Sequence, residues 1–99
     1  MLFMRFEWDE NKNRQNVLKH GIDFEDARKI FRGFTIDTLD DRFDYGEERT
    51  ISVGLMNGAA IIVVVHTDRQ GICRIISARP ALKQERKTYD KEVRKAFNA

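Results

Sequence analysis

The stretch RIISARPALKQER, residues 74–86, runs from a predicted strand into a predicted helix with almost no loop between them. Ile75 and Ile76 are β-branched residues that suit the pleated, half-buried surface of a strand. Pro80 lacks a backbone N–H and is tolerated in the first turn of a helix, so we expect the helix to begin close to it. Ser77 is the candidate helix cap.

Positive charges gather at this junction. Arg79, Lys83 and Arg86 are four and three residues apart and share one helix face if the helix starts early enough. We expect Arg74, in the preceding strand, to lie near them. A compact cluster of guanidinium and ammonium groups at a strand–helix corner suits phosphate. We therefore predict a small protein that holds an RNA backbone against a sheet and cuts it.

The length and composition fit one domain, residues 1–99, with one core. The longest apolar run, residues 59–65, has the length of a strand rather than of a membrane span. The first residues lack the pattern of a signal peptide. We therefore expect an unexported, cytoplasmic protein with no membrane association.

The single cysteine, Cys73, argues against an internal disulfide and a Cys-based zinc site. It falls in an apolar strand, where a small buried thiol is expected. The two histidines and the scattered carboxylates lack the spacing of metal ligands. We expect neither a metal nor a cofactor.

Charge is unevenly distributed along the chain, although the net charge is only +2. Residues 37–48 are rich in Asp and Glu, whereas the chain from Arg69 onward is rich in Lys and Arg. A basic C-terminal third fits a polyanion-binding surface. It equally fits a solvated helix face balanced by the acidic middle, and charge alone leaves both interpretations open.

The order of predicted elements is typical of an α+β sandwich, a meander sheet with helices packed on a face. Asn57-Gly58 is the strongest turn signal, because a two-residue hairpin needs positive φ at both positions. The first helix is polar, with Val17 and Leu18 as its only strong apolar anchors, so it should lie on the surface. The elements are a short strand at 3–8, a helix capped by Asp9 and ending at Gly21, a second helix from Asp23 to Gly33 that forms a hairpin with it, three to four antiparallel strands at 34–39, 49–56, 60–67 and 72–78, and a helix at about 81–97.

Several motifs, in this order along nearly the whole chain, resemble the BrnT toxins, a family of small bacterial proteins. The residues that carry the resemblance are 7–12, 18–27, 46–49, 66–67 and 74–79, with Glu85, Arg86 and Tyr89.

The resemblance implies a RelE-like ribonuclease fold and an activity that degrades RNA and stops translation. It also implies a BrnA-type antitoxin with a ribbon-helix-helix DNA-binding part. Operator DNA would be bound only through the toxin–antitoxin complex, which represses its own operon.

Cationic candidates for RNA cleavage come from the basic junction. Arg79 is the first candidate for stabilising the transition state, because a guanidinium matches two phosphate oxygens; the alternative is an ion pair with Glu48 or Glu85. Arg49 could assist, or could form only a rim salt bridge. The candidates for holding the RNA backbone are Lys83, Arg86, Arg74 and Lys19.

Three further residues are candidates for proton transfer. His66 and His20 carry imidazoles, which exchange protons near neutral pH. His66 could instead be a hydrogen-bonded core residue, and His20 could instead stabilise a helix C-terminus. Glu48 is a possible general base, or only a partner of Arg49.

Two other functions stay open. The same basic face could bind RNA or DNA without cutting it, which predicts salt-sensitive binding and intact nucleic acid. The acidic segment 37–48 and a hydrophobic rim could exist chiefly to seat an antitoxin.

Overall fold

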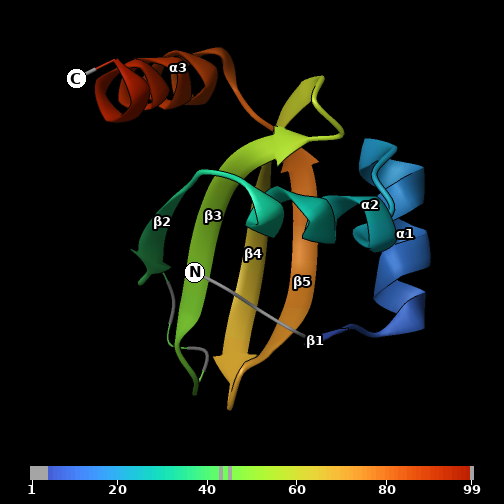
Figure 1. Cartoon of the computed structure of the whole chain (residues 1–99). Coiled ribbons are helices and arrows are strands. Elements are labelled where there is room, and N and C mark those ends of the chain that lie inside the picture. The colour runs from blue at the N-terminus through green and yellow to red at the C-terminus, as the bar shows by residue number, and fades with distance from the viewer. Residues whose placement is uncertain (1–4, 43, 45, 99) are drawn as a thin grey trace.

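The computed structural model describes residues 5–42, 44 and 46–98 (Figure 1). Strands and helices follow one another in the predicted order, so the α+β class is confirmed. The elements are β1 (Arg5–Glu7), α1 (Glu10–His20), α2 (Phe24–Ala27), the 3-10 helix η1 (Arg28–Arg32), β2 (Thr35–Asp40), β3 (Arg49–Met56), β4 (Ala60–Arg69), β5 (Ile72–Pro80) and α3 (Lys83–Phe97).

The five strands form one mixed sheet in the order β1-β5-β4-β3-β2. Strands β2 to β5 are the expected antiparallel meander. The short N-terminal strand adds to the sheet in parallel with β5, where Arg5 is opposite Ile72 and Glu7 is opposite Arg74. Residues 3 and 4 of its predicted range lie outside the described residues.

The Asn57-Gly58 turn joins β3 to β4 as predicted. Both residues have positive φ, 53° and 69°. The turn closes with a 3.1 Å hydrogen bond from the Ala59 N–H to the Met56 carbonyl. These positive φ values explain why Asn and Gly occupy the two positions.

The main core lies between one face of the sheet and the segment that contains α2 and η1. The Phe24 side chain from α2 and the Ile30 side chain from η1 are almost fully buried against Ile62, Val64 and Ile75. The segment approaches β3 closely at Gly54, where an added Cβ would lie 2.8 Å from the Ile30 Cβ. A side chain at that position would push η1 away from the sheet.

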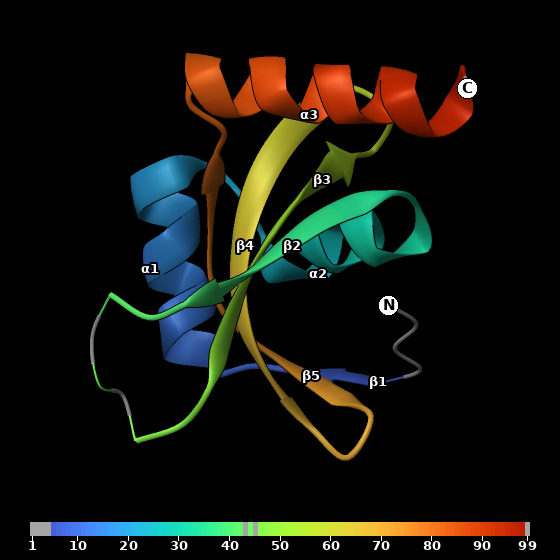
Figure 2. The ribbon, with the colours of Figure 1, turned by 90° about the vertical axis from the view of Figure 1, so that its left-hand side faces the viewer.

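The expected pair of antiparallel helices is only partly formed. The second helix has four α-helical residues and continues as the five-residue η1. Helix α3 crosses one end of the sheet, while α1 and α2 lie on either side of the strands (Figure 2). Helices α1, α2 and α3 therefore contact different parts of the sheet rather than one common face.

The junction between β5 and α3 differs from the prediction. Pro80 ends the strand instead of opening the helix, Ser77 lies within β5 rather than at a cap, and α3 starts only at Lys83. The Glu85 carboxylate accepts a 2.7 Å hydrogen bond from the Leu82 N–H and so closes the first turn. The backbone N–H groups at the start of a helix have no carbonyl partner one turn earlier, so the side chain of a glutamate at the third helical position can accept from one of them.

Helix α1 is held by polar contacts rather than by the predicted apolar anchors. Val17 and Leu18 are 40% and 88% exposed, whereas Asn13 and Asn16 are buried. Asn13 accepts a 2.9 Å hydrogen bond from the Phe24 N–H and thereby joins α1 to the start of α2. The helix is attached through its amide side chains.

Asn16 attaches α1 to the sheet. Its side-chain amide donates to the carbonyls of Ala78 and Ile22, at 2.8 and 2.9 Å, and accepts from the Ala78 N–H at 3.1 Å. Strand β1 pairs with β5 only at residues 72–74. The Asn16 amide therefore provides at Ala78 the donor and acceptor that a neighbouring strand supplies elsewhere.

None of the helices in the described part of the chain is long and apolar enough to cross a membrane.

We predict that Asn16→Ala lowers the free energy of unfolding by about 2–4 kcal/mol, because it leaves buried backbone groups of Ala78 and Ile22 without partners. Urea denaturation measures the change. The matched control is Asn11→Ala on the exposed side of the same helix, for which we expect less than about 0.5 kcal/mol. Equal effects of the two substitutions would contradict this role of Asn16.

Candidate nucleic-acid interface

A groove of about 270 Å³ lies between α1 and the free edge of β5. The lining side chains come from one stripe of α1 and from two consecutive residues of β5. They are Lys12, Gln15, Asn16, Lys19, His20, Ile76 and Ser77.

The helix presents its polar residues to the groove because of their spacing. Lys12, Asn16 and Lys19 are four and three residues apart, so they lie on one face. Asp9 fixes the start of the helix by accepting the Lys12 N–H at 3.1 Å. Gly21, with φ of 70°, ends the helix and leaves His20 in its last turn.

The strand side of the groove is shaped by a β-bulge. Ser77 pairs with Val65 and Ile75 pairs with His66, so Ile76 is an extra residue in β5. A bulge turns a side chain out of the regular alternation. This irregularity brings Ile76 and Ser77 together at the wall of the groove.

The charge of the groove favours an anion. Among the described residues that line it, two are lysines and one is a histidine, and none is Asp or Glu. Gln15 and Ser77 add hydrogen-bonding groups. The groove can therefore hold a phosphate through Lys12 and Lys19 with an imidazole beside it.

Arg79 is engaged by a carboxylate in this structure. Its two terminal nitrogens donate to the two oxygens of Glu85 at 2.8 and 2.9 Å. The hydrogen bond from Arg79 is the main reason why the pKa of Glu85 is lowered, and the same bond raises the pKa of Arg79. Of the two expected interpretations of Arg79, the geometry favours the ion pair with Glu85.

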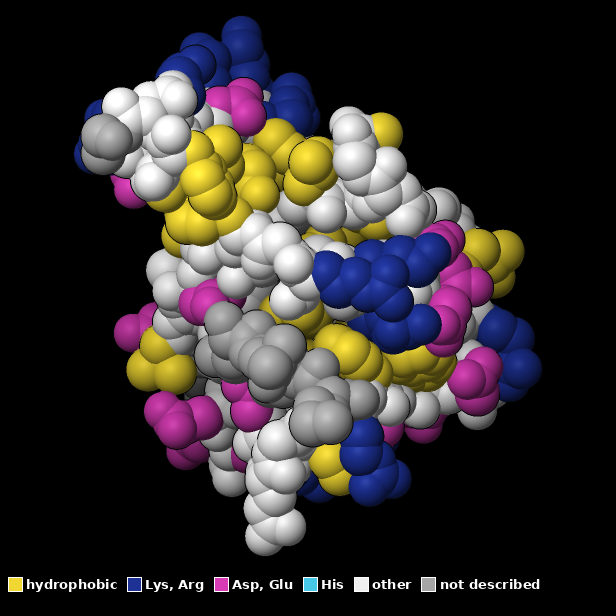
Figure 3. All heavy atoms as spheres, viewed as in Figure 1, with side chains coloured by type: hydrophobic (Ala, Val, Ile, Leu, Met, Phe, Trp, Pro, Cys, Tyr) yellow, Lys and Arg dark blue, Asp and Glu magenta, His cyan; other side chains and the backbone are white. Residues whose placement is uncertain are grey.

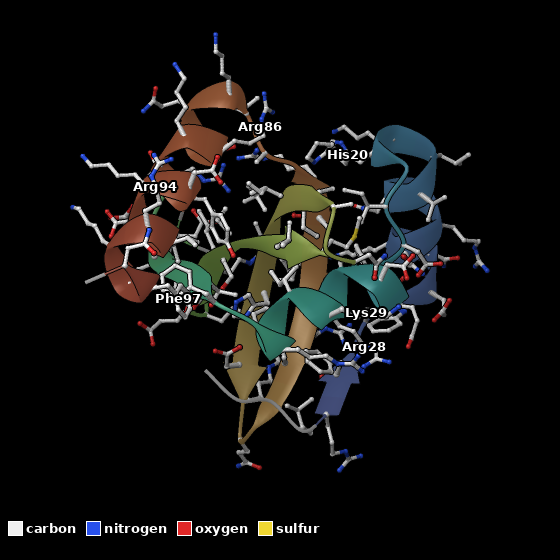
Figure 4. All side chains as sticks on the ribbon, turned by 45° about the horizontal axis from the view of Figure 1, so that its top comes forward. His20, Arg28, Lys29, Arg86, Arg94 and Phe97 are labelled. Atoms are coloured by element: carbon white, nitrogen blue, oxygen red, sulfur yellow. The ribbon has the colours of Figure 1, made fainter. Side chains whose placement is uncertain are left out.

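Two other cations lie near this junction. Lys83 is the first residue of α3 and is exposed. Arg86 donates a 2.7 Å hydrogen bond to the Ala81 carbonyl. Figure 4 shows Arg86 on α3 and His20 at the end of α1 at the same end of the molecule. Cations from α1 and α3 therefore border the end of β5.

Arg74 does not join this cluster, and the expected proximity to Arg79 is wrong. The two residues are five positions apart along β5, which corresponds to about 16 Å in an extended strand. Arg74 lies instead near the start of the strand, 3.6 Å from Glu7 on β1. The error arose because both residues belong to one extended strand, which runs on to Pro80.

Glu48 and Arg49 lie at the start of β3, toward the opposite end of the sheet from His20 and Lys19, whereas His66 lies within β4 opposite Ile75. Arg49 opens β3 opposite Asp40, and the Glu48 carbonyl accepts a 2.9 Å hydrogen bond from the Thr67 hydroxyl. The His66 side chain is fully buried. The predicted site residues therefore do not form one cluster, and His66 has the surroundings of a core histidine.

Sequence reasoning missed Lys12, Gln15 and Ser77 as groove residues. The available signal was the polar stripe of α1, in which Lys12 and Lys19 are seven residues apart around Asn16. The bulge that adds Ser77 carries no comparable signal, because Ile75 and Ile76 both suit a regular strand.

The outer side of α3 carries a separate group of cations. In Figure 3 lysines and arginines project from the top of the helix, and hydrophobic side chains form a band beneath it. Phe97 contributes to this region, with its ring 5.9 Å from that of Phe34 and 69% of the residue exposed.

Comparison with known proteins adds two findings. Residues 8–85 match the family model described as "Ribonuclease toxin, BrnT, of type II toxin-antitoxin system". The chain is also similar to the crystal structure of the Brucella abortus ribonuclease toxin BrnT, with 29% identity and a TM-score of 0.62 over 81% of this chain and 99% of that one. A search of curated proteins finds no match.

We predict that Glu85→Gln lowers the free energy of unfolding at pH 7 by less than about 1 kcal/mol, because the Arg79 pair is partly exposed to solvent. Folding lowers the pKa of Glu85, so the stabilisation is present above its ordinary value of 4.5. The difference from the wild type should therefore shrink as the pH falls below 4.5.

Urea denaturation across this pH range measures the effect. Glu92→Gln is the control, because Glu92 forms a 3.5 Å pair with Lys95 on an exposed part of the same helix. A difference between wild type and Glu85→Gln that grows on acidification would show that the sign is wrong.

Proposed function

We propose, from the premise that this chain belongs to the BrnT family of ribonuclease toxins of type II toxin–antitoxin systems, that it is a metal-independent endoribonuclease whose RNA lies in the α1–β5 groove. The observation that carries this assignment is the groove itself, which gathers Lys12, Lys19 and His20 without a lining carboxylate among the described residues. Cleavage of this RNA inhibits translation.

The proposed reaction is attack of the ribose 2′-hydroxyl on the adjacent phosphorus. The hydroxyl must lose a proton, the leaving 5′-oxygen must gain one, and the added negative charge on phosphorus must be stabilised. His20 transfers protons, because an imidazole does so near neutral pH. Lys19 and Lys12 stabilise the phosphate charge.

The other site candidates take different places in this proposal. Arg79 is held by Glu85 at the junction, so we assign it the positioning of the groove end rather than contact with the scissile phosphate. Lys83 and Arg86 contact the RNA backbone beside the groove. Four predicted site residues take no part in the groove chemistry: Arg49, Glu48, His66 and Arg74.

We further propose that the partner is a BrnA-type antitoxin with a ribbon-helix-helix part, and that the chain reaches operator DNA only in complex with it. Membership of a type II toxin–antitoxin family implies a protein antitoxin. A non-catalytic RNA-binding module is the competing function, and intact RNA after incubation with the purified protein distinguishes it.

We predict that the purified protein degrades RNA in EDTA and that His20→Asn reduces the cleavage rate by about 100-fold or more, because proton transfer contributes that much to such reactions. Gel analysis of a labelled RNA measures the rate. Lys91→Ala, on the exposed part of α3, is the control and should cleave at the wild-type rate. Full activity of a folded His20→Asn protein would remove His20 from the mechanism.

We predict that Lys19→Ala weakens RNA binding and makes it less dependent on salt. Removal of one phosphate contact should reduce the slope of log K against log salt concentration by about 0.7 for a single strand. Fluorescence anisotropy with a 2′-O-methyl RNA, which lacks the attacking hydroxyl, measures binding without cleavage. An unchanged slope for Lys19→Ala, with a reduced one for Lys91→Ala, would place the RNA on α3 instead.

A further inference from the structure

Four polar side chains form a hydrogen-bonded chain across neighbouring strands of the sheet. The Ser52 hydroxyl donates to the Asp37 carboxylate at 2.6 Å and lies 2.8 Å from His66 Nε2. His66 Nδ1 lies 2.7 Å from the Asp68 carboxylate. His66 and Ser52 are fully buried. The chain links β2, β3 and β4 and ends at the exposed Asp37 and Asp68.

The hydrogen bonds of this chain limit where its protons can lie. Its three links each require one hydrogen, the Ser52 hydroxyl provides one, and a neutral imidazole provides one. With Ser52 donating to Asp37, His66 Nε2 must donate to Ser52. In that arrangement either a proton or a metal cation lies between His66 Nδ1 and the Asp68 carboxylate.

Cys73 adds a third atom that could bind a metal ion beside His66 and Asp68. It lies on β5 directly opposite Asp68 on β4 and is fully buried. Its sulfur, one nitrogen of His66 and one oxygen of Asp68 all lie within 4.8 Å of one another. Their spacing along the chain did not predict this group, because cross-strand pairing brings the cysteine to the histidine.

We propose that His66 Nδ1, Asp68 Oδ1 and Cys73 Sγ form a binding site for a divalent cation of the zinc class. Nitrogen, thiolate and carboxylate ligands together suit Zn²⁺, which accepts distances of about 2.0–2.3 Å to them. Around such an ion the ligand atoms lie roughly 3.3–3.7 Å apart. His66 and Asp68 must therefore separate slightly from their present 2.7 Å.

Two other contacts of His66 match those of a metal-bound histidine. A ligating imidazole donates its other ring N–H to a fixed acceptor, which sets the tautomer and the ring orientation. Ser52, itself held by Asp37, provides that acceptor. The Phe31 ring packs edge-on against His66, with centroids 5.0 Å apart, and limits its movement.

The fourth ligand position opens toward solvent on the Asp68 side, whose side chain is 30% exposed. The site joins β4 to β5 and contains none of the residues that line the groove, so its role is structural. It is independent of the proposed RNA cleavage. A bound cation connects β4 to β5, two strands that are also joined by the turn after Arg69.

Metal binding should depend on pH. Burial raises the pKa of the Cys73 thiol, and the nearby Asp68 charge adds to the effect. A cation that binds here must replace the thiol proton, so its binding should weaken as the pH falls.

Co²⁺ titration of the full-length protein tests the site. We expect one equivalent to bind with a thiolate-to-cobalt charge-transfer band and the visible bands of four-coordinate Co²⁺, and Zn²⁺ to displace it. Cys73→Ala should lose the charge-transfer band, and both Cys73→Ala and Asp68→Asn should weaken Zn²⁺ binding by about 100-fold or more. Asp90→Asn on exposed α3 is the matched control and should bind as the wild type does.

Circular dichroism and urea denaturation without metal confirm that each variant is folded. If Cys73→Ala does not fold, Asp68→Asn, which changes a partly exposed residue, is the test variant. Co²⁺ binding without a thiolate band, or binding that Cys73→Ala leaves unchanged, would overturn the site. So would ¹⁵N spectra that show His66 protonated on both ring nitrogens and unaffected by one equivalent of Zn²⁺, because a proton would then lie between His66 Nδ1 and the Asp68 carboxylate.

Discussion

The hydrogen bonds between the Asn16 amide and the backbone of Ala78 determine where α1 lies. Beyond residue 74, the β1 side of β5 has no strand neighbour in the described part of the chain, and a buried strand edge must find other hydrogen-bond partners. A side-chain amide can supply both a donor and an acceptor. Because α1 buries no apolar residue, this polar attachment, with that of Asn13, substitutes for hydrophobic packing. Lys12, Lys19 and His20 follow from it, since they occupy the same helix beside Asn16.

The sheet carries two polar sites of different character. Cations from α1 and from the start of α3 surround a groove that is open to solvent. Within the sheet, the buried Ser52 and His66 form a polar chain that ends at the exposed Asp37 and Asp68. An exposed cationic groove suits a polyanion, whereas a mostly buried set of nitrogen, oxygen and sulfur ligands suits a small cation. The two sites therefore have different physical properties and different proposed ligands.

Much of the fold follows from local sequence patterns. The alternation at residues 49–56, the Asn57-Gly58 turn and the Asp9 and Gly21 helix ends predicted elements that the structure contains. Pro80 misled the prediction, because a proline is compatible with the end of a strand as well as with the start of a helix. The candidate site was harder to predict from the sequence. Lys19 and His20 were identified, but Ser77 depends on a bulge, the pairing of Arg79 with Glu85 depends on the position of α3, and the meeting of Cys73 with His66 depends on strand register. Those features are set by tertiary contacts, which single-sequence patterns do not contain.

The most direct test of the central claim is an NMR titration of ¹⁵N-labelled protein with a short 2′-O-methyl RNA. If the RNA backbone lies between α1 and β5, the backbone amide signals of Lys12, Lys19, His20 and Ser77 should shift together and saturably, and those of Glu48 and Arg49 should not. Shifts confined to Glu48, Arg49 and their neighbours would contradict the account and place the RNA at the opposite end of the sheet.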